Sequence, residues 1–363
     1  MKLRAHPYRL PFRKPLITSS KTYNHRSGLL LMLLVGRKSF YGEAAPLPGF
    51  SSETVEEIKK TVENNGQQWK EMLQREKPTK LLEAYYLKTH IPPSLQFALD
   101  SLAYQLEAHR TDQSLLSHLF NIYSPQISVN AVISLSNKAT IIEQETDQLI
   151  KKGYNTLKCK VGLNAHYELS QLHKLRANYP RLNIRLDANG AWTPEEAKNY
   201  LKEVETIGIE YCEEPLANPT ADAYALLQAQ TKSPLALDES LTKANHIEAL
   251  LSYCSVLILK PMVLGSFRTL FDICKRANKL NIKIVLTTSL ESGIGRNITA
   301  ALATGIGSFS YAHGLNTAGL LGRDLLPEKP KISNGFISTD KLFPITKDNL
   351  KLQNLQHEPE INL

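Results

Sequence analysis

Three carboxylates and three lysines recur at regular intervals between residues 156 and 261. Asp187, Glu213 and Asp238 each follow a short apolar segment, and Lys160 and Lys260 end the segments before and after them. Successive charges are 22 to 27 positions apart, which fits one strand, one amphipathic helix and two short loops. The spacing therefore predicts a repeated βα unit with a charged group at the carboxyl end of each strand, where barrel enzymes carry their chemistry.

The three acids point to a metal. Carboxylates from neighbouring strands would converge above such a barrel and repel one another unless a hard cation lay between them. An oxygen-only ligand set without His or Cys favours Mg²⁺ over zinc, with Mn²⁺ as the alternative. Glu214 competes with Glu213 as the ligand, because adjacent strand residues point to opposite faces. A single such acid is more often a helix cap, but three at regular strand intervals indicate a metal site.

The lysines suggest acid–base chemistry. Lys158 and Lys160 share one face of their strand, whereas Cys159 points to the helix layer. Repulsion between neighbouring ammonium groups should lower the pKa of at least one, which could then act as a base. Lys260 would face them across the ring. Taken alone, the Lys158 and Lys160 pair could also be a solvated strand edge.

Four further residues are candidate substrate contacts. Arg185 lies two residues before Asp187 on the inward face, where it could bind an anion or form a structural ion pair. Asn189 follows Asp187 closely, and Ser289 and Glu291 follow the seventh predicted strand at the same barrel opening. The complete set is Arg185, Asn189, Ser289 and Glu291.

The elements that position these groups form two parts. Alternating strands and helices from residue 127 to 313 give eight predicted strands and about seven helices, which favours a closed parallel barrel. The first predicted strand is 127–134, and the last two, 282–289 and 309–313, flank a helix at 296–304. Residues 1–121 are predicted to form an α+β domain.

This α+β domain has its own sequence signals. A hairpin is predicted at residues 36–39, one helix starts near residue 51, and another spans residues 93–109. The polar residues 18–26 suggest a lid or specificity loop. The tail, residues 326–363, is expected to pack back on this domain.

Composition narrows the function class. The chain has 363 residues, 42% of them hydrophobic, and a net charge of +8, without a nucleic-acid-binding motif. The charge suits a small anionic substrate or an ordinary lysine-rich surface. No apolar run is long enough for a membrane span or suited to a signal peptide, and the four cysteines lack zinc spacing, so we expect a reduced cytoplasmic protein. The sequence does not indicate an oligomeric state.

The motifs together resemble the enolase superfamily, specifically its muconate-lactonizing-like subgroup. Residues 258–266, 288–295, 8–12 and 26–28 are similar to o-succinylbenzoate synthases of menaquinone biosynthesis. The resemblance implies an α/β fold, a modified TIM barrel (β/α)7β at residues 122–325, with residues 1–121 and the tail as an α+β capping domain. The motifs are Lys158-x-Lys160, Asp187-x-Asn189, Glu213-Glu214-Pro215, Asp238-Glu239-Ser240 and Lys260-Pro261.

The resemblance also implies a reaction, the Mg²⁺-dependent syn dehydration of 2-succinyl-6-hydroxy-2,4-cyclohexadiene-1-carboxylate to 2-succinylbenzoate. Lys160 would remove the proton, Lys158 would lower the pKa of Lys160, and Lys260 would stabilise the enediolate; enolase-superfamily sites are a standard example of this pairing of base and metal. Dipeptide epimerases and N-acylamino-acid racemases share the skeleton, with Lys260 returning the proton. A Schiff-base aldolase and a basic binding protein with an inactive barrel are the remaining alternatives.

Overall fold

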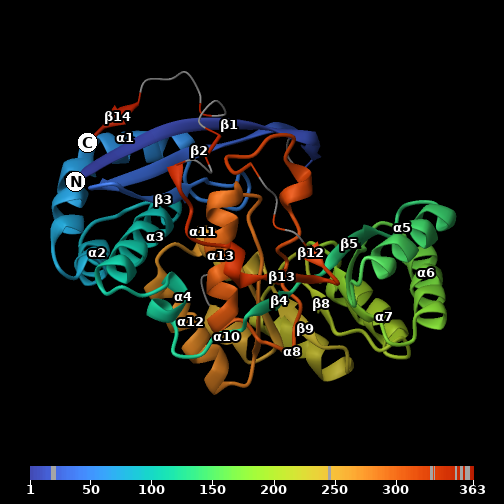
Figure 1. Ribbon diagram of the computed structural model, residues 1–363. Coiled ribbons are helices and arrows are strands. Elements are labelled where there is room, and N and C mark those ends of the chain that lie inside the picture. Colours follow the sequence, from blue (N-terminus) through green and yellow to red (C-terminus); the bar gives the residue numbers. More distant parts are fainter. Residues whose placement is uncertain are drawn as a thin grey trace.

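The computed structural model describes residues 1–17, 22–243, 247–327, 330, 332–347, 350–351, 355 and 360–363. An antiparallel sheet with its helices lies beside a parallel barrel (Figure 1). This arrangement confirms the predicted fold class. Across the described ranges, none of the helices combines the length and apolar character needed to span a lipid bilayer.

Four strands form the antiparallel sheet of the capping domain. They lie in the order β14 (Ile361–Asn362), β1 (Lys2–Ile17), β2 (Thr22–Val35) and β3 (Lys38–Ala44). Gly36, at a φ of 58°, and Arg37 make the predicted hairpin between β2 and β3. The predicted lid loop is wrong for residues 22–26, which belong to β2; residues 18–21 lie outside the described residues.

The apolar run in β2 is explained by burial on both faces of the sheet. Leu29, Leu31 and Leu33 pack in a core with the helices of the capping domain. Leu30 and Met32, which point the other way, belong to the core shared with the barrel. The helices of the capping domain are α1 (Val55–Gln74), α2 (Pro78–Tyr86), α3 (Pro93–Arg110) and α4 (Leu115–Leu119).

The start of α1 shows how local sequence sets a boundary. The helix predicted from residue 51 begins instead at Val55, because Thr54 and Glu57 form a reciprocal capping box. The residues before it, 45–54, form a connection from β3 that reaches over the barrel opening, as the site geometry below shows.

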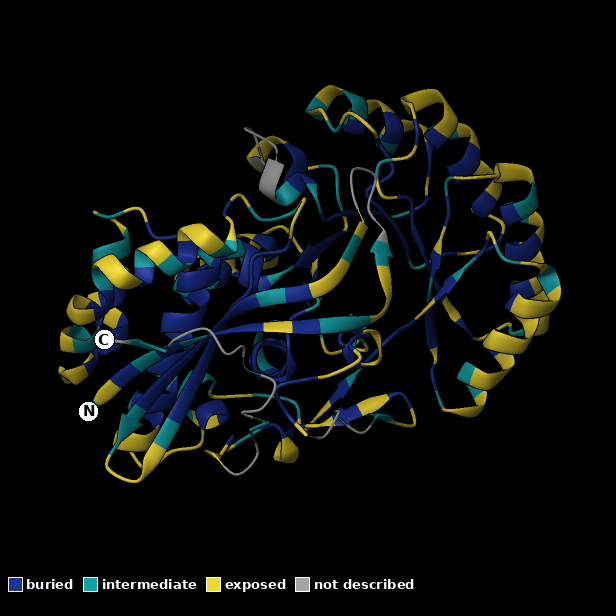
Figure 2. Ribbon diagram, turned by 90° about the horizontal axis from the view of Figure 1, so that it is seen from above, coloured by how far each residue is buried: buried dark blue, intermediate teal, exposed yellow. Residues whose placement is uncertain are grey.

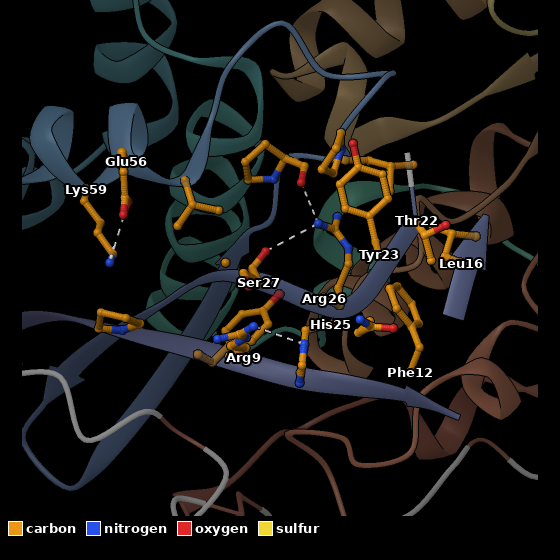
Figure 3. Close-up of a pocket in the computed structure, with 18 residues that line it drawn as sticks. Arg9, Phe12, Leu16, Thr22, Tyr23, His25, Arg26, Ser27, Glu56 and Lys59 are labelled. Atoms are coloured by element: carbon orange, nitrogen blue, oxygen red, sulfur yellow. Dashed lines mark hydrogen bonds and ion pairs between the residues drawn. The ribbon is translucent and has the colours of Figure 1, made fainter. Parts of the chain in front are cut away.

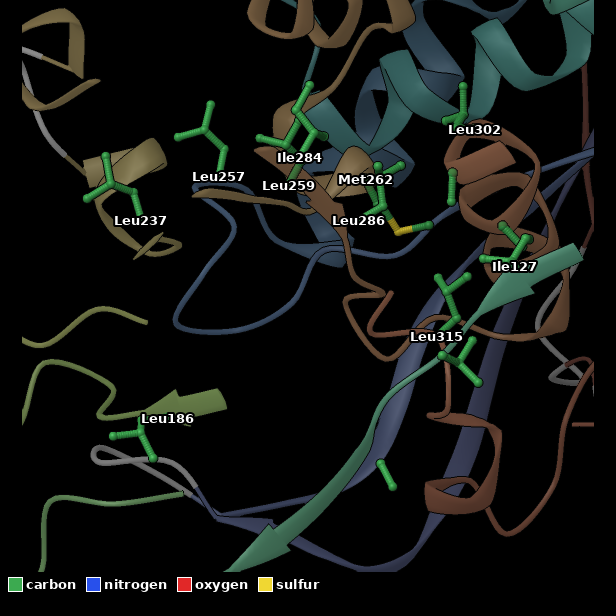
Figure 4. Packing of buried hydrophobic residues seen from close by; sticks show 14 of the residues in the cluster. Ile127, Leu186, Leu237, Leu257, Leu259, Met262, Ile284, Leu286, Leu302 and Leu315 are labelled. Atoms are coloured by element: carbon green, nitrogen blue, oxygen red, sulfur yellow. The ribbon is translucent and has the colours of Figure 1, made fainter. Parts of the chain in front are cut away.

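Seven parallel strands in sequence order form the barrel wall. Residues that point into the barrel, such as Val256, Ile258 and Val285, make a small central cluster. Residues of alternate strand positions, such as Leu257 and Leu259, point outward and pack under the helices (Figure 4). The strands are β5 (Ala131–Ser134), β6 (Thr156–Lys160), β7 (Asn183–Asp187), β8 (Tyr211–Glu213), β9 (Leu235–Leu237), β10 (Val256–Leu259) and β11 (Lys283–Leu286).

A short segment closes the ring in place of a regular eighth strand. His313 bridges to Val129 beside β5, and Gly314 bridges to Thr287 beyond β11, both in the parallel sense. The strand predicted at 309–313 is therefore wrong in extent, and Phe309 is exposed. The first predicted strand, 127–134, divides into β4 (Gln126–Ser128) and β5, since β4 pairs antiparallel with the tail.

Residues 293–304, in the last barrel helix, are buried throughout. Most of the other barrel helices lie outside the strands, with exposed outer faces and buried inner faces (Figure 2). They cover the strand side chains that point away from the ring. The helices are α5 (Ala139–Lys151), α6 (Ala165–Asn178), α7 (Pro194–Val204), α8 (Ala221–Gln230), α9 (Ser240–Lys243), α10 (Ile247–Leu251), α11 (Pro261–Leu264), α12 (Phe267–Lys279) and α13 (Gly293–Ile306).

The tail contacts both parts of the molecule. β12 (Ile332–Ser333) and β13 (Phe336–Ser338) extend the small sheet with β4 beside the barrel, whereas β14 and a bridge at Leu355 join β1. Two short 3₁₀ helices, Ala318–Leu320 and Thr339–Lys341, complete the described elements. The tail therefore links the two parts rather than packing on the capping domain alone.

Buried carboxylates of the capping domain cap two barrel helices. Glu43 accepts hydrogen bonds from the Ser292 and Gly295 amides (2.8 and 2.7 Å) at the start of α13, and from the Tyr8 hydroxyl. Asp100 accepts from the Phe267 amide (2.8 Å) at the start of α12 and from the Tyr86 hydroxyl (3.0 Å). Carboxyl oxygens that accept from the unpaired amides of a helix N-terminus stabilise the helix, so these contacts fix the cap to the barrel.

Asp100 gives this interface a pH dependence. Burial raises the pKa of its carboxyl from 3.8 to about 7, although the bonds from Phe267 and Tyr86 oppose the rise. Between about pH 4 and 7 the folded state holds a proton that the unfolded state has lost, so stability falls as the pH rises through this window, by up to about 1.4 kcal/mol per unit.

We therefore expect Asp100→Asn to remove this component, so that the stability of the variant relative to the wild type rises with pH across the window. Urea unfolding at several pH values measures it, with Asp112→Asn at an exposed site after α3 as the control. A stability difference that does not change with pH would contradict the assignment.

Candidate active site

The register of strands β6, β7 and β8 places Lys158 and Lys160 beside Asp187 and Glu213. Lys160, Asp187 and Glu213 lie directly opposite one another at the ends of β6, β7 and β8. The Lys158 Nζ lies 3.0 Å from Asp187 Oδ2 and 2.8 Å from Glu213 Oε1, so it bridges the two carboxylates. The Lys160 Nζ lies 3.2 Å from Asp187 Oδ2. Both lysines point into the barrel, as the period of the strand predicts.

Lys260 and Asp238 form the facing part of the cluster. Lys260 directly follows β10, and its Nζ forms an ion pair with Asp238 Oδ1. The same Nζ lies 4.9 Å from the centre of the Phe50 ring, which the capping domain contributes. The Phe50 ring, an attractive partner for a cation, therefore covers Lys260.

The three lysine side chains differ in how far they are exposed to solvent. The Lys160 side chain is 50% exposed, whereas those of Lys158 and Lys260 are 19% and 12% exposed. Lys160 is thus the amine with most access from the barrel opening. Its second contact is the Asn189 Oδ1, 2.8 Å from Nζ, so Asn189 helps to hold it.

The charges in the cluster oppose one expectation. Burial alone would lower the pKa of Lys158, but Asp187, Glu213 and Asp238 raise it well above its usual value. Lys158 is therefore not a lysine of the pair whose pKa is lowered, because the neighbouring acids outweigh the effect of burial. Burial would likewise lower the pKa of Lys260, and Asp238 and Glu213 raise it. Both side chains are ammonium groups near neutral pH.

Glu213 is the acid least compensated by the lysines. Burial raises its pKa well above the usual range, and Asp187 and Asp238 add to the rise, while Lys158 and Lys260 oppose it. Asp187 shows the reverse: burial favours a higher pKa, but Lys158 and Lys160 lower it. An ion pair of Lys158 with Glu213 and a raised pKa of Glu213 point in opposite directions. We assign a positive charge to Lys158, because this lysine faces several acids whose combined effect raises its pKa.

A hard cation suits the donor set. Glu213 Oε2 is buried and has no hydrogen-bond partner, a costly state that a cation would relieve. Asp187, Glu213 and Asp238 would be the oxygen donors. In the described part of the chain, no three His, Cys, Asp or Glu side chains are arranged to hold a metal as they stand, since the lysines take up the carboxylate oxygens.

The adjacent acids Glu213 and Glu214 have different contacts. Glu214 accepts from the amides of Asp238 (2.9 Å) and Ser240 (3.2 Å) and from the Ser240 hydroxyl. Its φ of 42° turns the chain away from the strand. Glu214 therefore holds the turn after β9, and Glu213 is the acid that faces the lysines.

Three of the four predicted substrate contacts have other partners. Arg185 is fully buried, binds Glu210 and the Ala312 carbonyl, and lies over the Tyr211 ring, so the structural ion pair is the correct alternative.

Ser289 and Glu291 bind each other, with 3.0 Å between the Ser289 Oγ and Glu291 Oε2, and Thr299 donates to the other Glu291 oxygen. Their hydrogen-bonding groups serve the loop after β11 rather than the charged cluster. Asn189 alone of the four lies in contact with the cluster.

Two residues of the site were not predicted. Glu239 is partly buried beside Asp238 and accepts from Asn189 Nδ2 at 3.2 Å; this burial raises the pKa of its carboxyl, and Asp238 adds to the rise. Its place in the Asp238-Glu239-Ser240 motif was a signal for it. Phe50 reaches Lys260 from the other domain, and no local pattern marks such a contact.

Two cavities in the described part of the chain are lined in part by residues 46–50. A small one of about 10 Å³ is bounded by Phe50, Asp238 and Lys260. A larger one of about 540 Å³ lies against β1, β2 and residues 46–48 (Figure 3). Because the larger cavity is lined by the capping domain and contains none of the acids of the cluster, we place the chemistry at the cluster.

Comparison with known proteins agrees with this arrangement. The family described as Enolase C-terminal domain-like matches residues 142–342. The chain belongs to the enolase superfamily. A second family, described as MenC, N-terminal domain, matches residues 1–105.

Individual relatives of this enolase-superfamily chain cover most of its length. The o-succinylbenzoate synthase of Vibrio cholerae serotype O1 is 28% identical over 342 residues, 90% of this chain and 92% of the relative. An enolase-superfamily protein from Listeria innocua superposes with a TM-score of 0.84 at 21% identity, covering 100% and 98% of the two chains.

A dipeptide epimerase from Enterococcus faecalis, complexed with Mg and the dipeptide L-Leu-L-Tyr, has a TM-score of 0.79 at 19% identity, covering 93% of this chain and 96% of its own. The sequence relative supports an enzyme, and the solved structures establish the fold.

Proposed function

We propose that the chain is an o-succinylbenzoate synthase that dehydrates 2-succinyl-6-hydroxy-2,4-cyclohexadiene-1-carboxylate to 2-succinylbenzoate. The observation that carries this proposal is the relative of that name aligned over 90% of the chain, together with the MenC N-terminal domain match. The lysines at the barrel opening supply the groups that such a reaction needs.

The proposed metal is Mg²⁺, with Asp187, Glu213 and Asp238 as its ligands. When bound, the ion would neutralise the negative charge that develops on the substrate carboxylate. Membership of a superfamily with Mg-dependent members and the unpartnered Glu213 Oε2 support this assignment.

The chain's own residues would carry the proton. Lys160 would remove the proton next to the substrate carboxylate, since it is the most exposed of the three amines. As the general base it would accept this proton on Nζ. Lys260, an ammonium group held by Asp238 and Phe50, would stabilise the enediolate from the other side. Loss of the hydroxyl and aromatisation of the ring then complete the dehydration.

A second candidate is epimerisation of a dipeptide or racemisation of an N-acyl amino acid. Lysines on both sides of one site favour it, because one amine could remove the proton and the other return it. The solved structures most like this chain include a dipeptide epimerase and an N-succinyl Arg/Lys racemase, at 19% identity.

One assay separates the two. We expect purified protein with Mg²⁺ to convert the cyclohexadiene substrate to 2-succinylbenzoate, followed by the absorbance change on aromatisation. A panel of dipeptides and N-acyl amino acids, assayed by exchange of the α-hydrogen in D₂O, is the comparison. Exchange with the panel and no aromatic product would support the second candidate.

A further inference from the structure

A buried arginine of the capping domain holds together two segments beside the candidate active site. The Arg26 side chain, on β2, is 2% exposed, yet all five of its hydrogen-bond acceptors are main-chain carbonyl oxygens. A buried guanidinium is costly unless its donors are satisfied, and its planar fork can reach several carbonyls at once. The acceptors lie in both domains, so the contacts tie the domains together.

The first segment is the loop that carries Phe50. Arg26 donates to the carbonyls of Ala45 and Pro46, the latter at 2.5 Å, and Figure 3 shows it on the wall of the larger cavity. A turn follows directly, in which the Phe50 amide donates to the Leu47 carbonyl at 3.0 Å. Only this short turn separates the anchored carbonyls from Phe50, whose ring lies over Lys260.

The second segment is the loop after β11. Arg26 Nη2 lies 3.1 Å from the Ser289 carbonyl, and Nε lies 3.2 Å from that of Leu290. Leu290 has a φ of 62°, an unfavourable conformation for a branched side chain that needs outside support. The loop leaves the same end of the barrel as Lys260, since β10 and β11 are paired in register.

We infer that Arg26 is a positioning residue, which sets Phe50 over Lys260 and fixes the loop at residues 289–290 on the opposite side of the domain junction. Arg26 acts together with Glu43, whose carboxylate accepts from the Ser292 and Gly295 amides, so the guanidinium and this carboxylate set the separation of the two segments. The inference rests on the proposed function, because the reaction is the readout of the geometry.

The test is a double-mutant cycle with Arg26→Lys and Phe50→Ala. Lysine keeps the charge but lacks the fork, so we expect kcat/KM to fall by about 10- to 100-fold, mostly through kcat, as for a small misplacement near the reacting groups. If Arg26 acts through Phe50, the double variant should be little worse than either single variant. Arg9→Lys, exposed on β1, is the matched control and should keep wild-type kinetics.

Several outcomes would overturn the inference: wild-type kinetics in Arg26→Lys, additive losses in the double variant, or a change confined to the melting temperature. If the Arg26 variant does not fold, Phe50→Ala is measured alone, and unchanged kcat would overturn the inference that Arg26 acts on the reaction through Phe50. If the wild type forms no 2-succinylbenzoate, the proposed function fails separately, and the cycle is measured by α-hydrogen exchange.

Discussion

Replacing Lys160 with alanine should lower kcat by about 10²- to 10⁴-fold, the contribution of a positioned general base. Lys160 is half exposed, and its ion pair with Asp187 at 3.2 Å is shared with Lys158. In the variant Lys158 still pairs with the buried Asp187 carboxylate at 3.0 Å, so no buried charge is left without a partner and the variant should remain folded. The loss would therefore report on catalysis.

The measurement combines steady-state kinetics with thermal unfolding. Lys174→Ala, an exposed position on the helix that follows the same strand, is the control and should retain full activity. Exchange of the substrate α-hydrogen in D₂O should also disappear in the Lys160 variant, because proton removal precedes loss of the hydroxyl. Activity of Lys160→Ala within a few-fold of the wild type would assign the base elsewhere.

The strand order and the charged cluster could be predicted because both depend on short-range sequence pattern. The regular spacing of strand ends predicts that Asp187 and Glu213 lie at one edge of a parallel sheet, and their register confirms it. The alternation of side chains along a strand separates Glu213 from Glu214. Parallel barrels repeat one local unit, so few long-range contacts must be known in advance.

The sequence-based predictions were wrong where the same local sequence pattern fits two different structural surroundings. Arg185 shares the inward face with Asp187, but lies one layer deeper, where Glu210 and the Ala312 carbonyl bind it. The alternation of side chains along a strand tells which face of the sheet a residue is on, but not how deep in the barrel it lies. Similarly, the eighth strand is shorter than predicted, because the ring needs only His313 and Gly314 to close.

Contacts between the domains could not be predicted. Phe50 and Arg26 are far from the barrel residues in sequence, and their partners are a side-chain amine and main-chain carbonyls that carry no sequence signal. Glu43, which caps α13, looks like an ordinary strand acid until the helix is placed beside it. The contacts by which the capping domain covers the site could therefore be found only from the structure.

Removing divalent metal should abolish turnover, and adding Mg²⁺, or Mn²⁺, should restore it. The expectation depends on Glu213, a buried carboxylate with an unpartnered Oε2 and two neighbouring acids. The lysines alone leave this oxygen unsatisfied, whereas a cation among the three acids would satisfy it. EDTA treatment, dialysis and readdition of the ion test the activity.

The binding of Mg²⁺ can also be tested without an activity assay. Mg²⁺ at about 100 times its Kd should stabilise the wild type by about 2.7 kcal/mol, seen as a rise in the melting temperature. Glu213→Gln keeps the size of the side chain and removes its charge, so it should lose most of this rise, while Glu203→Gln, exposed on α7, should keep it. An equal rise in both variants, or turnover that resists EDTA, would show that these acids do not hold the ion. In that case the cluster would be a salt-bridge network, and the buried oxygen of Glu213 would have to be satisfied by the substrate itself.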